Sequence, residues 1–106
     1  MEMNFMHEER LRLKIFSAMQ GAKITSIGIF SSEVVDARLE LKFSLHSERD
    51  GYKYYETRTV EVGVPLSICG EIVYADEYPE THINEDGTGE ILVNVKMKTE
   101  KPLKAL

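Results

Sequence analysis

Ten consecutive residues, from Ala37 to His46, alternate strictly between apolar and polar side chains. The apolar positions are Ala37, Leu39, Leu41, Phe43 and Leu45. Successive side chains of a strand point to opposite faces of a sheet, so this alternation predicts a half-buried strand over residues 36–46 of an antiparallel sheet. It is the strongest pattern in the chain, and it concerns architecture rather than chemistry.

Two further strands are predicted on either side of it. Residues 23–30 are rich in β-branched side chains, and the polar residues 31–33 are expected to end that strand. Asp50-Gly51 is a typical turn pair, which predicts a hairpin between 36–46 and a strand over 52–62. A bulge near Thr59-Val60 would place the apolar residues of this last strand on one face.

Residues 5–20 are predicted to form a helix. Their apolar positions include Leu11, Ile15, Ala18 and Met19, which follow the spacing of one helix face. Asn4 is a suitable N-terminal cap, and Gly21 stands where a left-handed C-terminal cap would fall. This segment therefore supplies the helical part of the predicted fold.

The last third of the chain gives one ambiguous segment and one clear one. Residues 63–75 fit either a helix opening at Pro65 or a turn followed by a short strand over 71–75, and the β-branched side chains favour the strand. Residues 90–98 alternate and follow a turn, so they predict a strand. We expect residues 99–106 to be a flexible tail.

These elements predict an α+β fold in which an N-terminal helix packs on one face of a four- to five-stranded antiparallel sheet. A chain of 106 residues is long enough for one such core, and we assign residues 1–98 to a single domain.

Composition narrows the function more than any motif does. The formal net charge of −5 argues against nucleic acid as a partner, because phosphate contacts need a surplus of Lys and Arg. The single cysteine, Cys69, predicts a reducing compartment and reads as a small core residue. No signal peptide or run of roughly 20 apolar residues is recognisable, so we expect a cytoplasmic protein that has no membrane contact.

The sharpest shift in composition is the acidic segment 71–90, which holds seven carboxylates and no Lys or Arg. Interleaved tyrosines would supply contact area while the charge steers a basic protein surface toward it. The predicted binding residues are Tyr74, Asp76, Glu77, Tyr78, Glu80, Glu85 and Asp86. The alternative is a solvated loop whose charges only keep the protein in solution.

The sequence evidence for a metal site or for another binding site is weaker. Glu80, His82, Asn84 and Asp86 fall at alternate positions with oxygen and imidazole donors that suit zinc or manganese, but the second histidine is missing and Pro79 and Gly87 favour a loop. Tyr52, Tyr54 and Tyr55 follow the predicted turn and serve equally well as a partner anchor or as cross-strand packing. We expect no catalytic residue, no metal and no cofactor.

Three functions remain in view. The leading hypothesis is a small acidic, non-catalytic protein-binding module that covers a partner's basic surface, as inhibitors, immunity proteins and counter-defence proteins do. The second is a small-molecule-binding or metal-assisted enzyme built around His82. The third is a homo-oligomeric structural component that pairs through a sheet face or edge.

Overall fold

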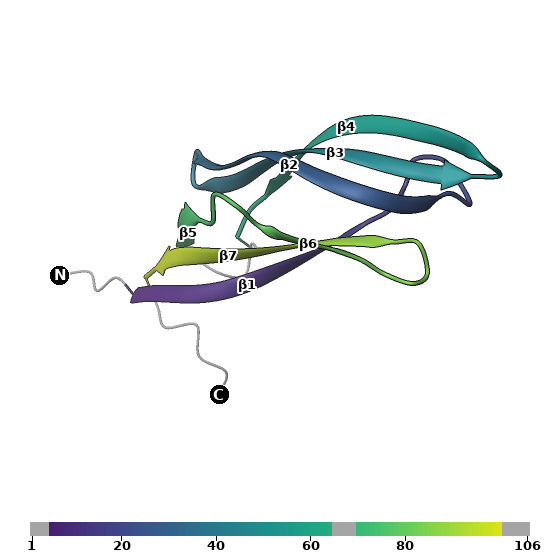
Figure 1. Ribbon diagram of the computed structural model, residues 1–106. Helices are drawn as coiled ribbons and strands as arrows, with labels where there is room; N and C mark the ends of the chain where they lie inside the picture. Colours follow the sequence, from purple (N-terminus) through teal and green to yellow (C-terminus); the bar gives the residue numbers. More distant parts are fainter. Residues whose placement is uncertain (1–4, 65–69, 101–106) are drawn as a thin grey trace.

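The computed structural model describes residues 5–64 and 70–100, and within these ranges every regular element is a β-strand. The strands form two antiparallel sheets that lie as two layers (Figure 1). In chain order they are β1 (Phe5–Ile15), β2 (Lys23–Val35), β3 (Arg38–Arg49), β4 (Tyr52–Val62), β5 (Gly70–Ala75), β6 (Glu80–Ile83) and β7 (Gly89–Thr99). The predicted α+β class is therefore wrong, and the fold is all-β.

One sheet, which we call sheet B, is a meander of β2, β3 and β4. Its two hairpins turn on residue pairs that both have positive φ: Asp36 and Ala37 at 51° and 63°, and Asp50 and Gly51 at 53° and 80°. Two central residues with positive φ define the type I′ turn, whose twist matches that of paired strands. The hairpin predicted through Asp50-Gly51 is confirmed, whereas β3 begins two residues later than predicted because Asp36 and Ala37 form a turn.

The other sheet, sheet A, has β7 at its centre, with β1 on one side and β5 and β6 on the other. β1 and β7 pair along their whole length, from Phe5 opposite Thr99 to Ile15 opposite Gly89. The first and last strands of the described chain are thus direct neighbours.

β1 replaces the predicted N-terminal helix. From Arg10 to Ile15 polar and apolar residues alternate, and Leu11, Leu13 and Ile15 point to the core side, opposite Val93, Ile91 and Gly89 of β7. Ala18 and Met19, which completed the helical spacing, lie in the connection to β2. Pairing with β7 outweighs the helix propensity of the Glu, Arg, Leu and Lys side chains in this segment.

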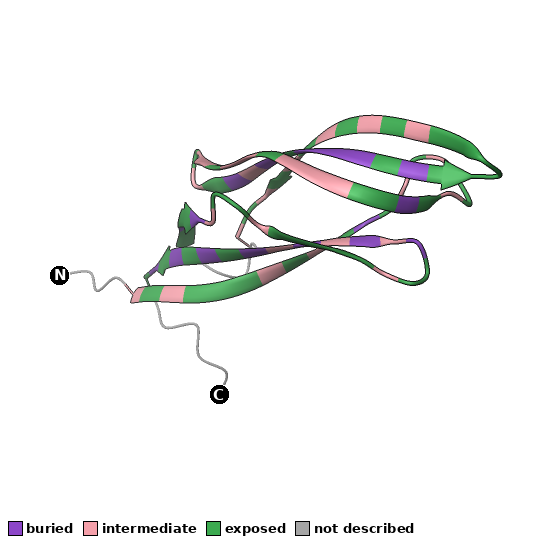
Figure 2. Ribbon diagram, viewed as in Figure 1, coloured by how far each residue is buried: buried purple, intermediate pink, exposed green. Residues whose placement is uncertain are grey.

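The core lies between the two sheets, and both central strands show alternate buried bands (Figure 2). Its fully covered members from the central strands are Leu39, Leu41, Phe43, Leu45, Ile91 and Val93. The prediction that Leu41 and Phe43 are buried is confirmed, since both have 0% exposure. Side chains from the two inner faces of a sandwich interdigitate in this way.

β2 runs past the polar residues that were expected to end it. Its register against β3 shifts between Ile24 and Ser26 and again between Ile29 and Ser31. Each shift inserts one extra residue, Thr25 or Phe30, and such a bulge changes which later side chains face the core. The strand therefore ends at Val35 rather than at Phe30.

β4 has no bulge, contrary to the prediction at Thr59-Val60, because β3 and β4 pair in continuous register from Leu39 opposite Val62 to Arg49 opposite Tyr52. The regular register places Glu56 and Arg58 on the same face as Val60 and Val62.

These two inward charges form an ion pair. The Arg58 guanidinium also donates a hydrogen bond of 2.6 Å to the main-chain carbonyl of Phe16, the residue that follows β1. A charge-assisted bond to a carbonyl offsets part of the cost of placing a guanidinium beside the core.

The strands predicted over 71–75 and 90–98 are confirmed as β5 and β7. Thr99, where the tail was expected to begin, is the buried last residue of β7. Pro65, Cys69 and residues 101–106 lie outside the described residues, and so do the interpretations placed on them.

Candidate functional site

The acidic segment contains an interrupted edge of sheet A. β5 pairs with the end of β7, and β6 pairs with its beginning, both antiparallel. Residues 76–79 separate the two, so that β5 and β6 read as one strand along β7 with a four-residue excursion in the middle. Interruptions of this kind re-aim side chains and stop further pairing at an edge.

Asp76 fixes the point where the excursion leaves the sheet. Its main-chain N–H donates to the carbonyl of Asn94 at 3.0 Å, and its carboxylate Oδ2 accepts the N–H of Asn94 at 2.9 Å. The side chain thus accepts the N–H that a continuing strand would bind with a carbonyl. Asp76 is a structural residue, and one of its oxygens is not free for a partner.

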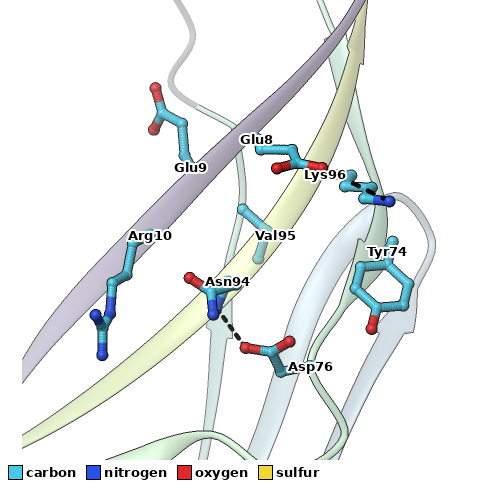
Figure 3. Close-up of a pocket in the computed structure, with 8 residues that line it drawn as sticks. All are labelled: Glu8, Glu9, Arg10, Tyr74, Asp76, Asn94, Val95 and Lys96. Carbon is cyan, nitrogen blue, oxygen red and sulfur yellow. Dashed lines mark hydrogen bonds and ion pairs between the residues drawn. The ribbon is translucent and has the colours of Figure 1, made fainter.

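The excursion opens onto the outer face of sheet A. Figure 3 shows Asp76 beside Asn94, with Tyr74 on the neighbouring strand and Arg10 projecting from β1. A hollow of about 430 Å³ lies over this face. Its lining comes from three strands and comprises Glu8, Glu9, Arg10, Tyr74, Asp76, Asn94, Val95 and Lys96.

The charges in this hollow are mixed and mostly paired. Arg10 donates to Glu80 at 2.5 Å across β7, and the Lys96 ammonium lies 3.7 Å from the Glu8 carboxylate. The same ammonium lies 5.3 Å from the centre of the Tyr74 ring. Arg10 of β1 therefore neutralises Glu80 of the acidic segment, whereas Lys96 of β7 pairs with Glu8 of β1. The sequence of the acidic segment alone does not reveal either pairing.

A second hollow, of about 470 Å³, adjoins the first and is open to solvent. Its lining comprises Tyr74, Asp76, Glu77, Tyr78, Glu80 and Asn94. Among the residues that the structure describes, no Lys or Arg lines it. Tyr78, at 88% exposure, projects from the excursion and is the most exposed of the large apolar or aromatic side chains in the described ranges.

Five of the seven predicted binding residues meet at this second hollow, but Glu85 and Asp86 do not. Those two lie in the loop between β6 and β7, beyond the other end of β6. Asp86 accepts hydrogen bonds there from the Thr88 hydroxyl at 2.6 Å and the Thr88 N–H at 2.9 Å. These bonds, the hydroxyl first, hold the pKa of the Asp86 carboxyl below its ordinary value of 3.8.

Sequence reasoning missed Arg10, Asn94 and Lys96. The missing signal was the alternation in residues 10–15, which sets Arg10, Arg12 and Lys14 on the outer face once β1 is recognised as a strand. Asn94 is marked by the same alternation in β7, where it follows Leu92 and precedes Lys96 on that face.

The hypothesis of a site around His82 finds no cluster to support it. The loop expected between Pro79 and Gly87 is wrong for residues 80–83, which form β6 with Glu80 and His82 on its outer face, opposite Leu92 and Glu90. Asn84, in the loop that follows, donates from its side chain to the Thr88 hydroxyl. Over residues 5–64 and 70–100, no three His, Cys, Asp or Glu side chains are grouped closely enough to hold a metal ion.

Two tyrosines of the β3–β4 hairpin, Tyr52 and Tyr55, are exposed. Tyr55 lies on the outer face of sheet B with its ring edge-on to His46, at 4.9 Å between ring centres. This contact is the cross-strand packing that the sequence left as one of two alternatives. Tyr52 stays exposed.

No protein-family model, curated protein or solved structure matches the chain. In the part of the chain that the structure describes, there is no helix long and apolar enough to cross a membrane.

Proposed function

We propose that this protein is a small, non-catalytic protein-binding module whose acidic segment covers a basic surface of its partner, in the manner of inhibitors, immunity proteins and counter-defence proteins. The docking site is the excursion 76–79 together with the second hollow beside it. The observation that carries the proposal is Tyr78, an aromatic side chain held out into solvent above carboxylates. Aromatic anchors of this kind dominate the energy of many interfaces.

Two features support a preformed docking site. The excursion is held at its start by two hydrogen bonds between Asp76 and Asn94, one from the Asp76 main chain and one to its carboxylate, so Tyr78 is displayed from an ordered base. Preorganised contacts lose less entropy on binding. The hollow carries three carboxylates beside two tyrosine rings, a combination that attracts a basic surface and then buries aromatic area.

The experiment is capture from the native host by immobilised wild-type protein, with kinetics on the purified partner. Tyr78→Ala removes the anchor, and Glu77→Lys reverses a charge that no described residue pairs. Asp76 is left intact because its replacement would also release the excursion from Asn94. Glu33→Lys on the outer face of sheet B changes the net charge equally and is the matched control.

We expect Tyr78→Ala to speed dissociation roughly tenfold. Glu77→Lys should mainly slow association, and added salt should reduce this difference, because charges separated by more than about 10 Å are screened at 0.1 M. Glu33→Lys should behave as wild type. A captured partner that binds the Tyr78 and Glu77 variants as wild type does would move the docking site elsewhere and contradict the proposal.

A further inference from the structure

The second hollow differs from the first in the charge of its walls. The first has Arg10 and Lys96 among its lining residues, whereas the second presents three carboxylates, two phenol rings and one amide. The aromatic walls, Tyr74 and Tyr78, come from β5 and from the excursion. A cation that enters this hollow therefore meets negative charge and aromatic faces together.

The carboxylates are not equally available. Asp76 accepts the Asn94 N–H through Oδ2, and Glu80 is paired with Arg10. Among the described residues, nothing engages the Glu77 carboxylate or the Tyr78 ring. The hollow thus keeps one fixed carboxylate, one in an exchangeable surface pair and one without a partner in the described ranges.

The outer face of sheet A already has one cation beside an aromatic ring. The Lys96 ammonium lies 5.3 Å from the centre of the Tyr74 ring, within the range of a cation–π contact. Lys96 lies on β7 directly opposite Tyr74 of β5, and it is not among the residues that line the second hollow. The Tyr78 ring, by contrast, meets no cation of the described chain.

We propose that the second hollow receives an arginine side chain of the partner protein, with the guanidinium against the Tyr78 ring and its N–H groups on the Glu77 carboxylate. This inference rests on the proposed function and names the partner's chemistry. Arginine fits better than lysine because a guanidinium is planar, stacks on aromatic faces, offers a fork of donors to a carboxylate and is more weakly hydrated than an ammonium.

The hollow is also better matched to a side chain than to a free ligand. It is open to solvent, and its lining comes from β5, the excursion, the start of β6 and the middle of β7. An arginine on a protruding loop reaches such a hollow while its main chain stays outside. The mixed charges of the first hollow then lie beside the docked loop and restrict which neighbouring residues the loop can carry.

The test uses the whole protein and a displayed library of random peptides as the probe, so it does not depend on finding the natural partner. We expect the selected peptides to share an arginine. Replacing that arginine with lysine should weaken binding several-fold, and replacing it with citrulline, which keeps the shape and removes the charge, should weaken binding roughly tenfold.

Two variants test whether the selected peptides bind in the second hollow. Tyr78→Ala and Glu77→Gln should each weaken the selected peptides roughly three- to tenfold. Tyr55→Ala and Glu33→Gln make the same changes on the outer face of sheet B and should leave binding unchanged. All four side chains lie on the surface, so a circular dichroism spectrum identical to that of wild type is expected and confirms that the variants are folded.

The inference is overturned if the selection gives no peptide that depends on Tyr78, if the peptides lack a shared arginine, or if lysine and citrulline replace it without loss. If any of these results is found but capture of the natural partner still depends on Tyr78, the proposed function stands and only the inference of a bound arginine is overturned. Failure of both experiments would remove both.

Discussion

The two sheets are assembled from different kinds of contact. Sheet B joins three consecutive strands through two-residue turns, so each strand pairs with its neighbour in the chain. Sheet A joins β1 to β7 and so pairs residues 5–15 with residues 89–99. Local pairings need little loop closure, whereas pairing the two ends of the chain requires the intervening residues to be ordered first. The comparison predicts that sheet B is easier to identify from the sequence than sheet A. It also predicts that sheet B forms first during folding.

The sheets also protect their free edges differently. Charges at inward positions or interruptions discourage pairing between edges of different molecules. In sheet B, β4 carries Glu56 and Arg58 on its inner face, and β2 is bulged twice. In sheet A, β1 has Glu9 between inward neighbours His7 and Leu11, and the opposite edge is interrupted at 76–79. Such edges disfavour the hypothesis of a homo-oligomer built by strand pairing.

Main-chain hydrogen bonds join the β5–β6 edge of sheet A to the β2 edge of sheet B. Near the β2–β3 turn, the Ile72 N–H of β5 donates to the Ala37 carbonyl at 3.1 Å. Near the β6–β7 loop, the Ile24 N–H of β2 donates to the Gly87 carbonyl at 2.8 Å. These two bonds tie the sheets near the two ends of β2. The excursion that displays Tyr78 lies in the chain between these two ties, from Ile72 to Gly87.

The largest expected effect tests whether the sheets share one core. Leu41→Ala in sheet B and Ile91→Ala in sheet A each remove a side chain with 0% exposure, so each should cost about 2–5 kcal/mol of the free energy of unfolding through the cavity it leaves. Urea melts followed by fluorescence and by circular dichroism should give coincident transitions for wild type and both variants.

Two outcomes would break this picture. A loss below about 0.5 kcal/mol for either variant would show that its side chain is not in the core. Transitions that separate for Ile91→Ala, with sheet B unfolding later, would show that the sheets are independent units rather than two halves of one sandwich.

A smaller effect is expected where β4 meets the end of β1. Arg58→Met keeps the apolar stem and removes the hydrogen bond to the Phe16 carbonyl and the ion pair with Glu56. We expect a loss of about 1 kcal/mol, since the side chains are partly exposed and their charges partly screened. Arg38→Met breaks an ion pair with Glu61 on the outer face and is the control, expected within about 0.5 kcal/mol of wild type. Equal losses for both variants would deny Arg58 any special role.

The extent of sequence-based prediction follows the same division. The alternation around Leu41 and the Asp50-Gly51 turn specify β3, β4 and their hairpin, because both signals are local. The sequence of β1 resembles a helix because Ala18 and Met19 continue a helical spacing and the segment is rich in helix-forming residues. Its true partner lies more than seventy positions away, and no local pattern names it.

The candidate site was half predictable for the same reason. The acidic bias and the two tyrosines mark Tyr74, Asp76, Glu77, Tyr78 and Glu80 as a group, and the structure places them around one hollow. Composition could not show that the Asp76 carboxylate accepts a hydrogen bond from Asn94 or that Arg10 pairs with Glu80, because both contacts depend on the register of strands remote in sequence. Glu85 and Asp86 were included only because they are near in sequence.

The edge of sheet A offers the next prediction. Glu9→Val completes the inward alternation of β1 beside Leu11 and removes the inward charge. We expect the variant to self-associate with increasing concentration, measured by sedimentation equilibrium, while its free energy of unfolding changes little. Glu8→Val removes the same charge from the outer face, where Glu8 pairs with Lys96, and should stay like wild type. A monomeric Glu9→Val protein would show that Glu9 does not guard the edge.

The smallest effect concerns the loop between β6 and β7, which holds its shape through a carboxylate, unlike the positive-φ turns of sheet B. The Thr88 hydroxyl and N–H both donate to Asp86 and lower the pKa of its carboxyl below 3.8. A carboxyl whose pKa is lower in the folded than in the unfolded chain stabilises the fold above its unfolded value, and this contribution disappears as the pH falls through the folded pKa. In a titration followed by carboxyl-carbon NMR, Asp86 should therefore have its midpoint below 3.8, and Thr88→Val should raise it. The stability difference between wild type and Asp86→Asn should be present at neutral pH and vanish below that midpoint. A midpoint for Asp86 at or above 3.8, unmoved by Thr88→Val, would mean that the loop is held by its main chain alone, as the turns of sheet B are.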